Sequence, residues 1–388
     1  MLKQFRLKNY KNFKDEIILD LSNIAGYQYN LDCVYDNLIS KALIYGRNAT
    51  GKTNLGRAIM DIAYTIRGLS GFEDDKTFLN ADSREEYASF KYYFVFEGHN
   101  VNYEYSRKSS IELIKEKLKI DEKLVFNCDY LNKINDFSGM KYVNAETVNT
   151  ERYLNSANDD EETGEVLGKR IPFLRWLTSN TMLSNDSILM QLLNYIFRMS
   201  YIGNDVYSPF GIKRRMTSFF EILKEGDRVK DFERFLNAMG IECSLVLKEL
   251  PDNQFELYFL HDKLVPFIQT ASSGTLAATT LYRRLVFSGL YNTPKPSLIF
   301  IDEFDAFYHY EMSKNVIEYL KKNYPQTQVI FTTHNTVLMS NRIMRPDCLF
   351  ILSTKGNLTP LHNATERELR EGHNLAKMYM SGEFEKYE

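Results

Sequence analysis

The fold of this chain is decided by residues 41–55, which read Lys41-Ala-Leu-Ile-Tyr-Gly-Arg-Asn-Ala-Thr-Gly-Lys-Thr-Asn-Leu55. A short apolar run leads into two glycines, Gly46 and Gly51, and a Lys-Thr pair follows directly. Apolar residues then recur at helical spacing as far as Gly68. In this strand–loop–helix order the glycines let backbone N–H groups point inward, toward a polyphosphate at the helix N-terminus. The stretch therefore predicts a site for a nucleoside triphosphate.

The loop also predicts roles for individual side chains. Lys52 is expected to reach the β- and γ-phosphates and to act in catalysis, and the Thr53 hydroxyl is expected to ligate Mg²⁺. A chance glycine-rich turn is the plain alternative, but all the defining residues are present between a strand and a helix. The residues predicted to bind nucleotide here are Gly46, Asn48, Gly51, Lys52, Thr53 and Asn54.

Composition limits the class of protein. Apolar residues make up 44% and aromatic residues 14% of the 388 positions, which are globular values. Lysine and arginine number 48 against 51 acidic residues, so nucleic acid would need a local basic patch. The four cysteines form no C-x-x-C pair, which argues against a zinc site and a disulfide framework. With no signal peptide and no apolar run of about 18 residues, we expect a cytoplasmic protein without a membrane partner.

A second strong motif is Pro296-Ser-Leu-Ile-Phe-Ile-Asp-Glu-Phe-Asp305. Four consecutive apolar residues suit a strand that is buried on both faces, and ligands bind at the carboxyl ends of such strands. Asp302 is expected to hold Mg²⁺, directly or through water, and Glu303 to polarise the attacking water as a general base. A helix cap is the structural alternative for this Asp-Glu pair.

Two further motifs follow the same logic. The run from Gln328 to Asn335 predicts another buried strand, beyond which His334 could contact a γ-phosphate and the attacking water. Thr270-Ala-Ser-Ser-Gly-Thr275 precedes a helical stretch and offers Ser272, Ser273 and Gly274 to an anion. Alone, this serine-glycine motif is weak, because it could simply cap a helix.

The pattern of elements divides the chain into three parts. Residues 1–124 read as a β-rich lobe with the phosphate loop, including a hairpin over residues 87–105 that turns at Glu97-Gly98-His99-Asn100. Residues 125–239 lose the strand-like alternation and read as a helical insertion without heptads. Residues 240–388 alternate strand and helix, which predicts a largely parallel sheet. The fold class is α/β.

These motifs, in this order, resemble the ABC-type ATPase heads of the SMC-like group. The resemblance implies an ABC/SMC-like P-loop ATPase head with a β-rich N-terminal lobe and a helical insertion, binding ATP and Mg²⁺. It makes residues 272–275 the signature motif, Asp305 the D-loop acid that approaches the nucleotide, and His334 the switch histidine. It also implies a homodimer or larger homo-oligomer, in which residues 272–274 of one subunit approach the ATP bound at residues 46–53 of another.

A narrower resemblance covers about residues 1–68 and 240–385. Met1-Leu-Lys-Gln-Phe-Arg-Leu-Lys-Asn-Tyr10, Phe331-Thr-Thr-His-Asn-Thr336, Arg345-Pro-Asp347 and Tyr379-Met-Ser-Gly-Glu-Phe384 look like the compact ATPases of bacterial abortive-infection systems, such as those of the PARIS, OLD and Septu groups. This implies a slow ATPase that acts as sensor and scaffold in anti-phage defence. It would control a separate effector, such as a Toprim-type nuclease, because too few residues follow Leu352 for an attached one.

Two departures and two alternatives stand beside this interpretation. No glutamine lies between Gln28 and Gln191, where the Q-loop residue of ABC heads is expected, and Ala271 and Ser273 replace common signature residues.

A repair or maintenance ATPase that clamps DNA is the main alternative, and a transporter's ATPase subunit is the next. The basic cluster at residues 212–215 and the lysines Lys8, Lys11 and Lys14 could contact a partner or the nucleotide, or simply face solvent.

Overall fold

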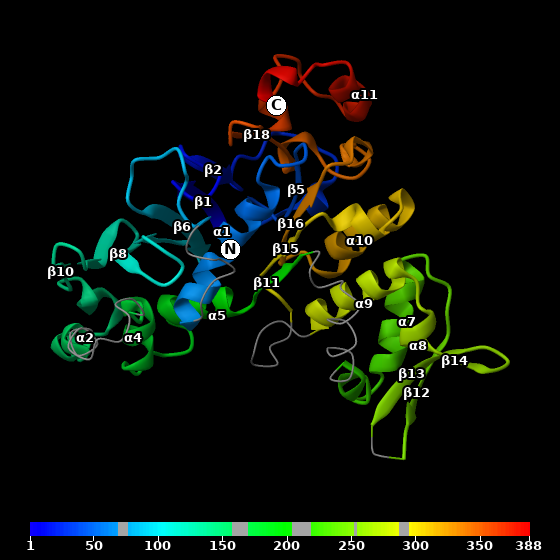
Figure 1. The fold of residues 1–388 in the computed structure, drawn as a ribbon, viewed down its shortest axis with the longest axis horizontal. Coiled ribbons are helices and arrows are strands. Elements are labelled where there is room, and N and C mark those ends of the chain that lie inside the picture. The colour runs from blue at the N-terminus through cyan, green and yellow to red at the C-terminus, as the bar shows by residue number, and fades with distance from the viewer. Residues whose placement is uncertain (69–76, 157–169, 204–218, 252–253, 287–294) are drawn as a thin grey trace.

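A computed structural model describes residues 1–388 except 69–76, 157–169, 204–218, 252–253 and 287–294. Two large β-sheets make up most of the body, and helix α1 (Lys52–Arg67) lies between them. Figure 1 shows α1 on one side of the core sheet and α10 (Tyr310–Asn323) on the other. In the described part of the chain, no helix is long and apolar enough to cross a membrane.

The core sheet has the strand order β11-β15-β16-β5-β17-β18. All neighbouring strands are parallel except β17 and β18. Every residue of β15 and β16 is buried, as expected for strands covered on both faces. The strand bounds are β5 (Lys41–Tyr45), β11 (Met199–Ile202), β15 (Leu298–Ile301), β16 (Gln328–Thr333), β17 (Leu349–Leu352) and β18 (Leu358–Pro360).

The second sheet is antiparallel and has the order β10-β9-β8-β7-β6-β1-β2. Burial alternates residue by residue along β6, so one face of the sheet packs inward and the other meets solvent. The predicted hairpin is present, with Glu97 and Gly98 both at positive φ in its turn. The bounds are β1 (Leu2–Lys8), β2 (Ile17–Asp20), β6 (Ala88–Phe96), β7 (His99–Arg107), β8 (Leu113–Ile120), β9 (Lys123–Asp129) and β10 (Ile134–Asp136).

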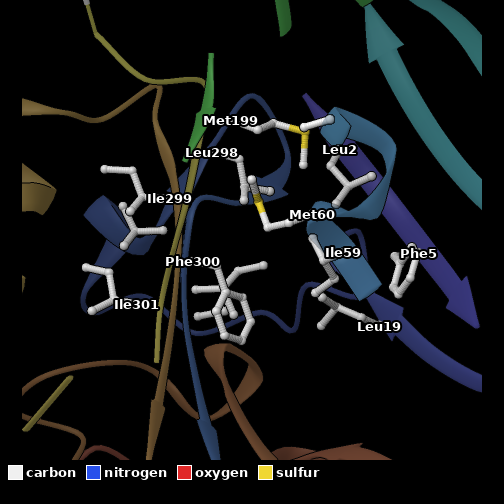
Figure 2. Close-up of a cluster of buried hydrophobic side chains, with 14 of the residues drawn as sticks. Leu2, Phe5, Leu19, Ile59, Met60, Met199, Leu298, Ile299, Phe300 and Ile301 are labelled. Carbon is white, nitrogen blue, oxygen red and sulfur yellow. The ribbon is translucent and has the colours of Figure 1, made fainter. Parts of the chain in front are cut away.

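Helix α1 is buried over most of its length because both sheets cover it. Figure 2 shows Ile59 and Met60 between β1 and β2 on one side and β15 on the other. Leu298 and Phe300 point toward α1, whereas Ile299 and Ile301 point to the opposite face of the core sheet. The alternation along β15 thus supplies one side chain in two to the helix that follows the phosphate loop.

The two sheets are tied together by the side chain of Gln328, at the start of β16. Its Oε1 accepts the backbone N–H of Leu2 at 2.7 Å, and its Nε2 donates to the carbonyl of Leu2 at 2.8 Å. The Tyr195 hydroxyl donates to the same Oε1 at 2.5 Å. A fully buried amide with three such partners fixes the first strand of the chain against the core sheet.

The remaining elements surround these sheets. A three-stranded sheet, β12-β13-β14, lies beside α7 and α8 at the end of the molecule away from β8 (Figure 1). The bounds are β3 (Val34–Tyr35), β4 (Leu38–Ile39), α2 (Thr150–Ser156), α4 (Phe173–Ser179), α5 (Ile188–Phe197), α7 (Arg228–Ala238), β12 (Leu245–Glu249), β13 (Phe255–Leu260), β14 (Leu264–Pro266), α8 (Phe267–Thr270), α9 (Ser273–Val286) and α11 (Leu375–Met380). Short 3-10 turns include η5 (Phe304–Phe307) and η6 (Thr336–Leu338).

The expected division at residues 124/125 and 239/240 fits this structure only in part. Residues 125–239 contain α2, α4, α5 and α7, in agreement with a helical region. The first boundary, however, falls inside β9, which pairs with β8 in the antiparallel sheet. Strand β11 pairs with β15, so part of the expected insertion belongs to the core sheet. The basic cluster at 212–215 lies outside the described residues.

Candidate nucleotide-binding site

Three neighbouring parallel strands end at one edge of the core sheet, and each is followed by predicted site residues. Gly46 follows β5, Asp302 follows β15 and His334 follows β16. The Gly46 N–H donates to the Thr333 carbonyl at 3.3 Å, which aligns the loop with the end of β16. The carboxyl edge of a parallel sheet is where such folds bind ligands.

The phosphate loop encloses the ammonium group of Lys52. Its Nζ donates to the carbonyl of Gly46 at 2.7 Å and to that of Arg47 at 2.9 Å. Burial lowers the pKa of Lys52, while the carboxylates of Glu303, Asp302 and Asp305 act in the opposite direction. A cation held inside the loop by carbonyl groups is available to an incoming phosphate, which would replace these acceptors.

Asn12, from the turn after β1, lies against the loop. Its Nδ2 donates to the Thr50 carbonyl at 3.0 Å, and its Oδ1 accepts from Asn54 Nδ2 at 2.8 Å. Gly51 has φ +99°, and a Cβ there would lie 2.2 Å from Asn12 Nδ2, so only glycine fits. Asn12 and Asn54 thus support the loop at the start of α1.

The neighbouring lysines have other contacts. Lys8 forms an ion pair with Glu85, and Lys11 Nζ donates to Thr77 Oγ1 at 3.3 Å. Lys14 is exposed. None of these contacts involves the phosphate loop, which favours the solvent-facing interpretation of these lysines.

Asp302 is buried and accepts hydrogen bonds from three hydroxyl groups. Thr53 Oγ1 donates to Oδ2 at 2.6 Å, and the Tyr201 hydroxyl donates to the same oxygen at 3.1 Å. Thr332 Oγ1 donates to Oδ1 at 2.7 Å. The residue pair predicted to bind the metal is therefore in direct contact, although 249 positions separate the two in sequence.

The donor set at Asp302 fits a magnesium ion. Hydroxyl and carboxylate oxygens are the hard ligands that Mg²⁺ prefers, and the ion usually takes its other ligands from phosphates and water. Within the described residues, Asp302 makes no salt bridge, and no group of three or more His, Cys, Asp or Glu could hold a metal alone. Thr53 and Asp302 are the residues that would hold the ion next to a bound nucleotide.

Glu303, the predicted general base, adopts an unusual backbone conformation. Its φ of 46° and ψ of 49° lie in the left-handed region, which costs a residue with a Cβ about 1–2 kcal/mol. Its N–H donates to Thr332 Oγ1 at 2.8 Å, so one threonine fixes both residues of the Asp-Glu pair. Strained residues of this kind cluster at functional sites.

His334 and Asp305 lie beside this pair along the chain. His334 is exposed, one residue beyond β16, and the following Asn335 caps η6 by accepting from Val337 N–H at 3.1 Å. Asp305 belongs to η5, and its Oδ1 is buried without a hydrogen-bond partner. A buried carboxylate oxygen without a donor is costly, which is the expected condition of a group that acquires a partner on binding.

Residues 272–274 begin α9. Ser272 Oγ accepts the Thr275 N–H at 3.1 Å, so Ser272 caps the helix, and Ser273 is exposed. A Cβ on Gly274 would lie 3.0 Å from the Phe307 carbonyl, so α9 and η5 approach closely at this glycine. Within the described structure, no hydrogen bond joins residues 272–274 to the phosphate loop of the same chain.

The structure therefore gathers most, but not all, of the predicted site. Gly46, Asn48, Gly51, Lys52, Thr53, Asn54, Asp302, Glu303 and His334 share one sheet edge, while Ser272, Ser273 and Gly274 lie at the start of α9. Sequence reasoning missed Asn12, Tyr201 and Thr332. Thr332 stands in the polar end of a strand that had been recognised, but Asn12 and Tyr201 come from distant segments and carry no local signal.

Together, the strand–loop–helix, the parallel sheet and the contact between Thr53 and Asp302 define a P-loop nucleotide-binding fold. Residues 41–340 match the family described as "AAA domain, putative AbiEii toxin, Type IV TA system". The match spans well over half of the 388 residues, so the chain belongs to this family. The predicted α/β fold with a P-loop is confirmed by the sheet topology and by this family match.

Solved structures similar to this chain include three SMC heads. One is the SMC head bound to the C-winged helix domain of ScpA (14% identity, TM-score 0.47, covering 90% of this chain and 94% of that one). Another is the head domain from Thermotoga maritima (16%, 0.45, 92% and 98%). A third, derived from Pyrococcus furiosus, has an extended coiled coil and is bound to the C-terminal domain of ScpA (14%, 0.43, 92% and 95%). Comparison with curated proteins gives no match.

Proposed function

We propose that the protein binds ATP with Mg²⁺ and hydrolyses it slowly, as a molecular switch that assembles with further copies of itself. The observation that carries this proposal is the 2.6 Å hydrogen bond from Thr53 to Asp302. It joins the hydroxyl of the phosphate loop, which follows β5, to the carboxylate at the end of β15, the buried strand on the other side of β16. Loop and strand are then ready to hold the phosphates and the metal together.

In this proposal, each site residue at the carboxyl edge of the core sheet has a defined role. Backbone N–H groups of residues 46–53 bind the phosphates, and Lys52 exchanges its carbonyl partners for the β- and γ-phosphates. Bound Mg²⁺ would neutralise charge that develops on the phosphate oxygens. Glu303 accepts a proton from the attacking water, and His334 contacts the γ-phosphate from the next strand.

The signature residues support a composite site. Ser272 and Ser273 are exposed at the N-terminus of a 14-residue helix, and they make no hydrogen bond to the loop of their own chain within the described residues. We infer that they bind the γ-phosphate held by a second copy, with Asp305 near the same interface. ATP would then hold two chains together, and hydrolysis would release them.

The biological role proposed here is control of a toxic effector in anti-phage, abortive-infection-type defence. The family description, with its reference to the AbiEii toxin and a toxin–antitoxin system, supports this role. The ATPase would act as sensor and scaffold, and a separate protein, such as a nuclease of the Toprim type, would do the damage.

The first experiment measures binding and turnover. Wild-type protein is expected to bind ATP and release phosphate slowly with Mg²⁺, and Lys52→Ala is expected to lose both activities. Lys314→Ala, which removes an exposed lysine of α10 that pairs with Glu318, is the matched control and should behave as wild type. Wild-type protein that neither binds nor hydrolyses ATP would contradict the proposal.

The composite site has its own test. Ser273→Arg should prevent ATP-dependent assembly, because the side chain is exposed at the start of α9, and should leave ATP affinity of the single chain intact. Mixed with Lys52→Ala protein it should regain turnover, because each mixed pair contains one intact site. Failure of the mixture to recover any turnover would exclude an interface that shares the site.

The DNA-clamping alternative makes a separate prediction of salt-dependent duplex binding. Several basic side chains on the outer face of the antiparallel sheet are paired with acids, as Arg6 and Lys91 are with Glu16, and Lys115 is with Asp129. Pairing of this kind weakens the field that a polyanion would meet. ATP-dependent duplex binding by the purified protein would favour the alternative over defence.

A further inference from the structure

Tyr201 reaches the candidate site from a segment that sequence patterns assign to the helical insertion. It lies on β11, whose register places it opposite Phe300 of β15. The two rings are stacked, with centroids 5.8 Å apart and planes 7° apart. The next ladder contact, from Asp302 N–H to the Ile202 carbonyl at 2.8 Å, holds the end of β11 beside Asp302.

The hydroxyl of this tyrosine meets the same carboxylate oxygen as the phosphate-loop threonine. Asp302 Oδ2 accepts from Tyr201 at 3.1 Å and from Thr53 at 2.6 Å, while Thr332 donates to Oδ1. Three hydroxyls from three different elements therefore fix the rotation of one carboxylate. Stacking and strand pairing in turn fix the direction from which the phenol approaches.

We propose that Tyr201 is a positioning residue for the metal-binding carboxylate, acting through Asp302 and not by contact with nucleotide. This inference rests on the proposed function, because it concerns the divalent cation that Thr53 and Asp302 would hold. A hydrogen-bond partner that orients a metal ligand typically accounts for about 10–100-fold in metal affinity. In this inference, the edge strand β11 contributes a positioning residue to the candidate site.

The competing role for Tyr201 is packing alone. Its ring covers Phe300, and a residue that only packs would act through the stability of the edge. Tyr201→Phe separates the two roles, because it keeps the ring and its stacking and removes only the hydroxyl. A packing residue would tolerate this change without effect on the metal.

The experiment titrates Mn²⁺, as a paramagnetic substitute for Mg²⁺, into full-length protein with a non-hydrolysable ATP analogue and follows the electron paramagnetic resonance signal. Tyr201→Phe is expected to bind Mn²⁺ about 10-fold more weakly or worse. Affinity for the analogue in EDTA and the midpoint of thermal unfolding are expected to stay near the wild-type values.

The matched control is Tyr105→Phe, which removes another hydroxyl donated to a buried aspartate, here Asp61 Oδ2 at 2.7 Å. It should lower stability and leave Mn²⁺ affinity unchanged. Equal Mn²⁺ affinity in wild type and Tyr201→Phe would overturn the inference while leaving the proposed function standing. Absence of nucleotide-dependent Mn²⁺ binding in the wild type would instead contradict the proposed function itself.

Discussion

Helix α1 contacts one buried aspartate at its N-terminus and carries another, Asp61, near its middle, and the two carboxylates differ in their partners. At the N-terminal end, the side-chain hydrogen bonds that Asp302 accepts within the described part of the chain all come from hydroxyl groups. Further along, Asp61 of the helix itself accepts from Arg107 Nη1 at 2.9 and 3.0 Å, and also from Tyr105 and Thr65. Asp61 has a hydrogen-bonded arginine as its counter-charge, whereas Asp302 makes no ion pair within the described residues and has only the nearby positive charge of Lys52.

The difference separates a structural from a functional buried charge. Burying an ion is costly unless a partner compensates it, and Arg107 provides that compensation for Asp61. The hydroxyl groups around Asp302 orient the carboxylate without neutralising it, which suits a residue that would share a divalent cation. The same helix is thus anchored near its middle by Asp61 and prepared for ligand at its N-terminus.

The largest expected effect is on ATP turnover at the candidate site. Glu303→Gln should lower ATP turnover about 10²–10⁴-fold, because a general base typically contributes this much. ATP binding should persist, and the ATP-bound assembly should live longer. Phosphate release and light scattering measure the two quantities, and turnover at the wild-type rate would remove Glu303 from the role of base.

The next largest expected effect is on the free energy of unfolding and concerns the pair formed by Asp61 and Arg107. Arg107→Leu should cost about 3–5 kcal/mol of unfolding free energy, because it leaves the buried Asp61 charge uncompensated. Urea unfolding measures the loss. The double variant Asp61→Asn with Arg107→Leu should recover part of it, and a double variant no more stable than the single one would show that the pair is not the cause.

The comparison is sharpest when the same substitution is made at both aspartates. Asp302→Asn should change stability by less than about 1 kcal/mol, because the neighbouring hydroxyls can rotate to accept as well as donate. Asp61→Asn should cost more, because Arg107 can only donate. Only Asp302→Asn should abolish stabilisation by Mg²⁺ with ATP in a thermal-shift assay. Equal unfolding midpoints for Asp302→Asn and Asp61→Asn would show that the two carboxylates do not differ in their contribution to stability.

The smallest expected effect concerns Glu116, a buried carboxylate on β8. It accepts from the hydroxyls of Tyr103 and Tyr130 and from the N–H groups of Phe173 and Leu174, at 2.6–2.9 Å. Burial raises its pKa above the usual glutamate range. The folded state then holds this proton more tightly than the unfolded state does.

Stability should accordingly fall as the pH rises from about 4.3, the usual glutamate value, through the raised pKa. Urea unfolding at a series of pH values, compared with Glu116→Gln, isolates this dependence. A pH profile with the same slope in both proteins would show that Glu116 does not cause it. The four donors also explain why Glu116, although unpaired with a cation in the described structure, does not resemble a metal ligand.

Much of the site could be predicted because each strong motif is contiguous in sequence. The phosphate loop, the Asp-Glu pair and His334 each follow an apolar run, and parallel neighbouring strands bring such ends together. The hairpin at Glu97-Gly98 was predicted for the same reason, since its turn chemistry is local.

What the sequence could not predict depends on contacts between distant segments. β11 is four residues long and follows a helix, so nothing local distinguishes it from the end of that helix, and its pairing with β15 spans about a hundred positions. Tyr201 and Asn12 acquire their neighbours only through such pairings. The predicted boundary at 124/125 lies inside β9, a strand that carries little alternation of its own.

The two hydrogen bonds between Gln328 and Leu2 also constrain how the chain is made. Strand β1 is synthesised more than three hundred residues before its partner at the start of β16. Until then α1, most of whose residues are buried in the folded protein, lacks one of the sheets that cover it. Contacts this distant in sequence close slowly, so the newborn chain should require protection by a chaperone before its first helix is covered.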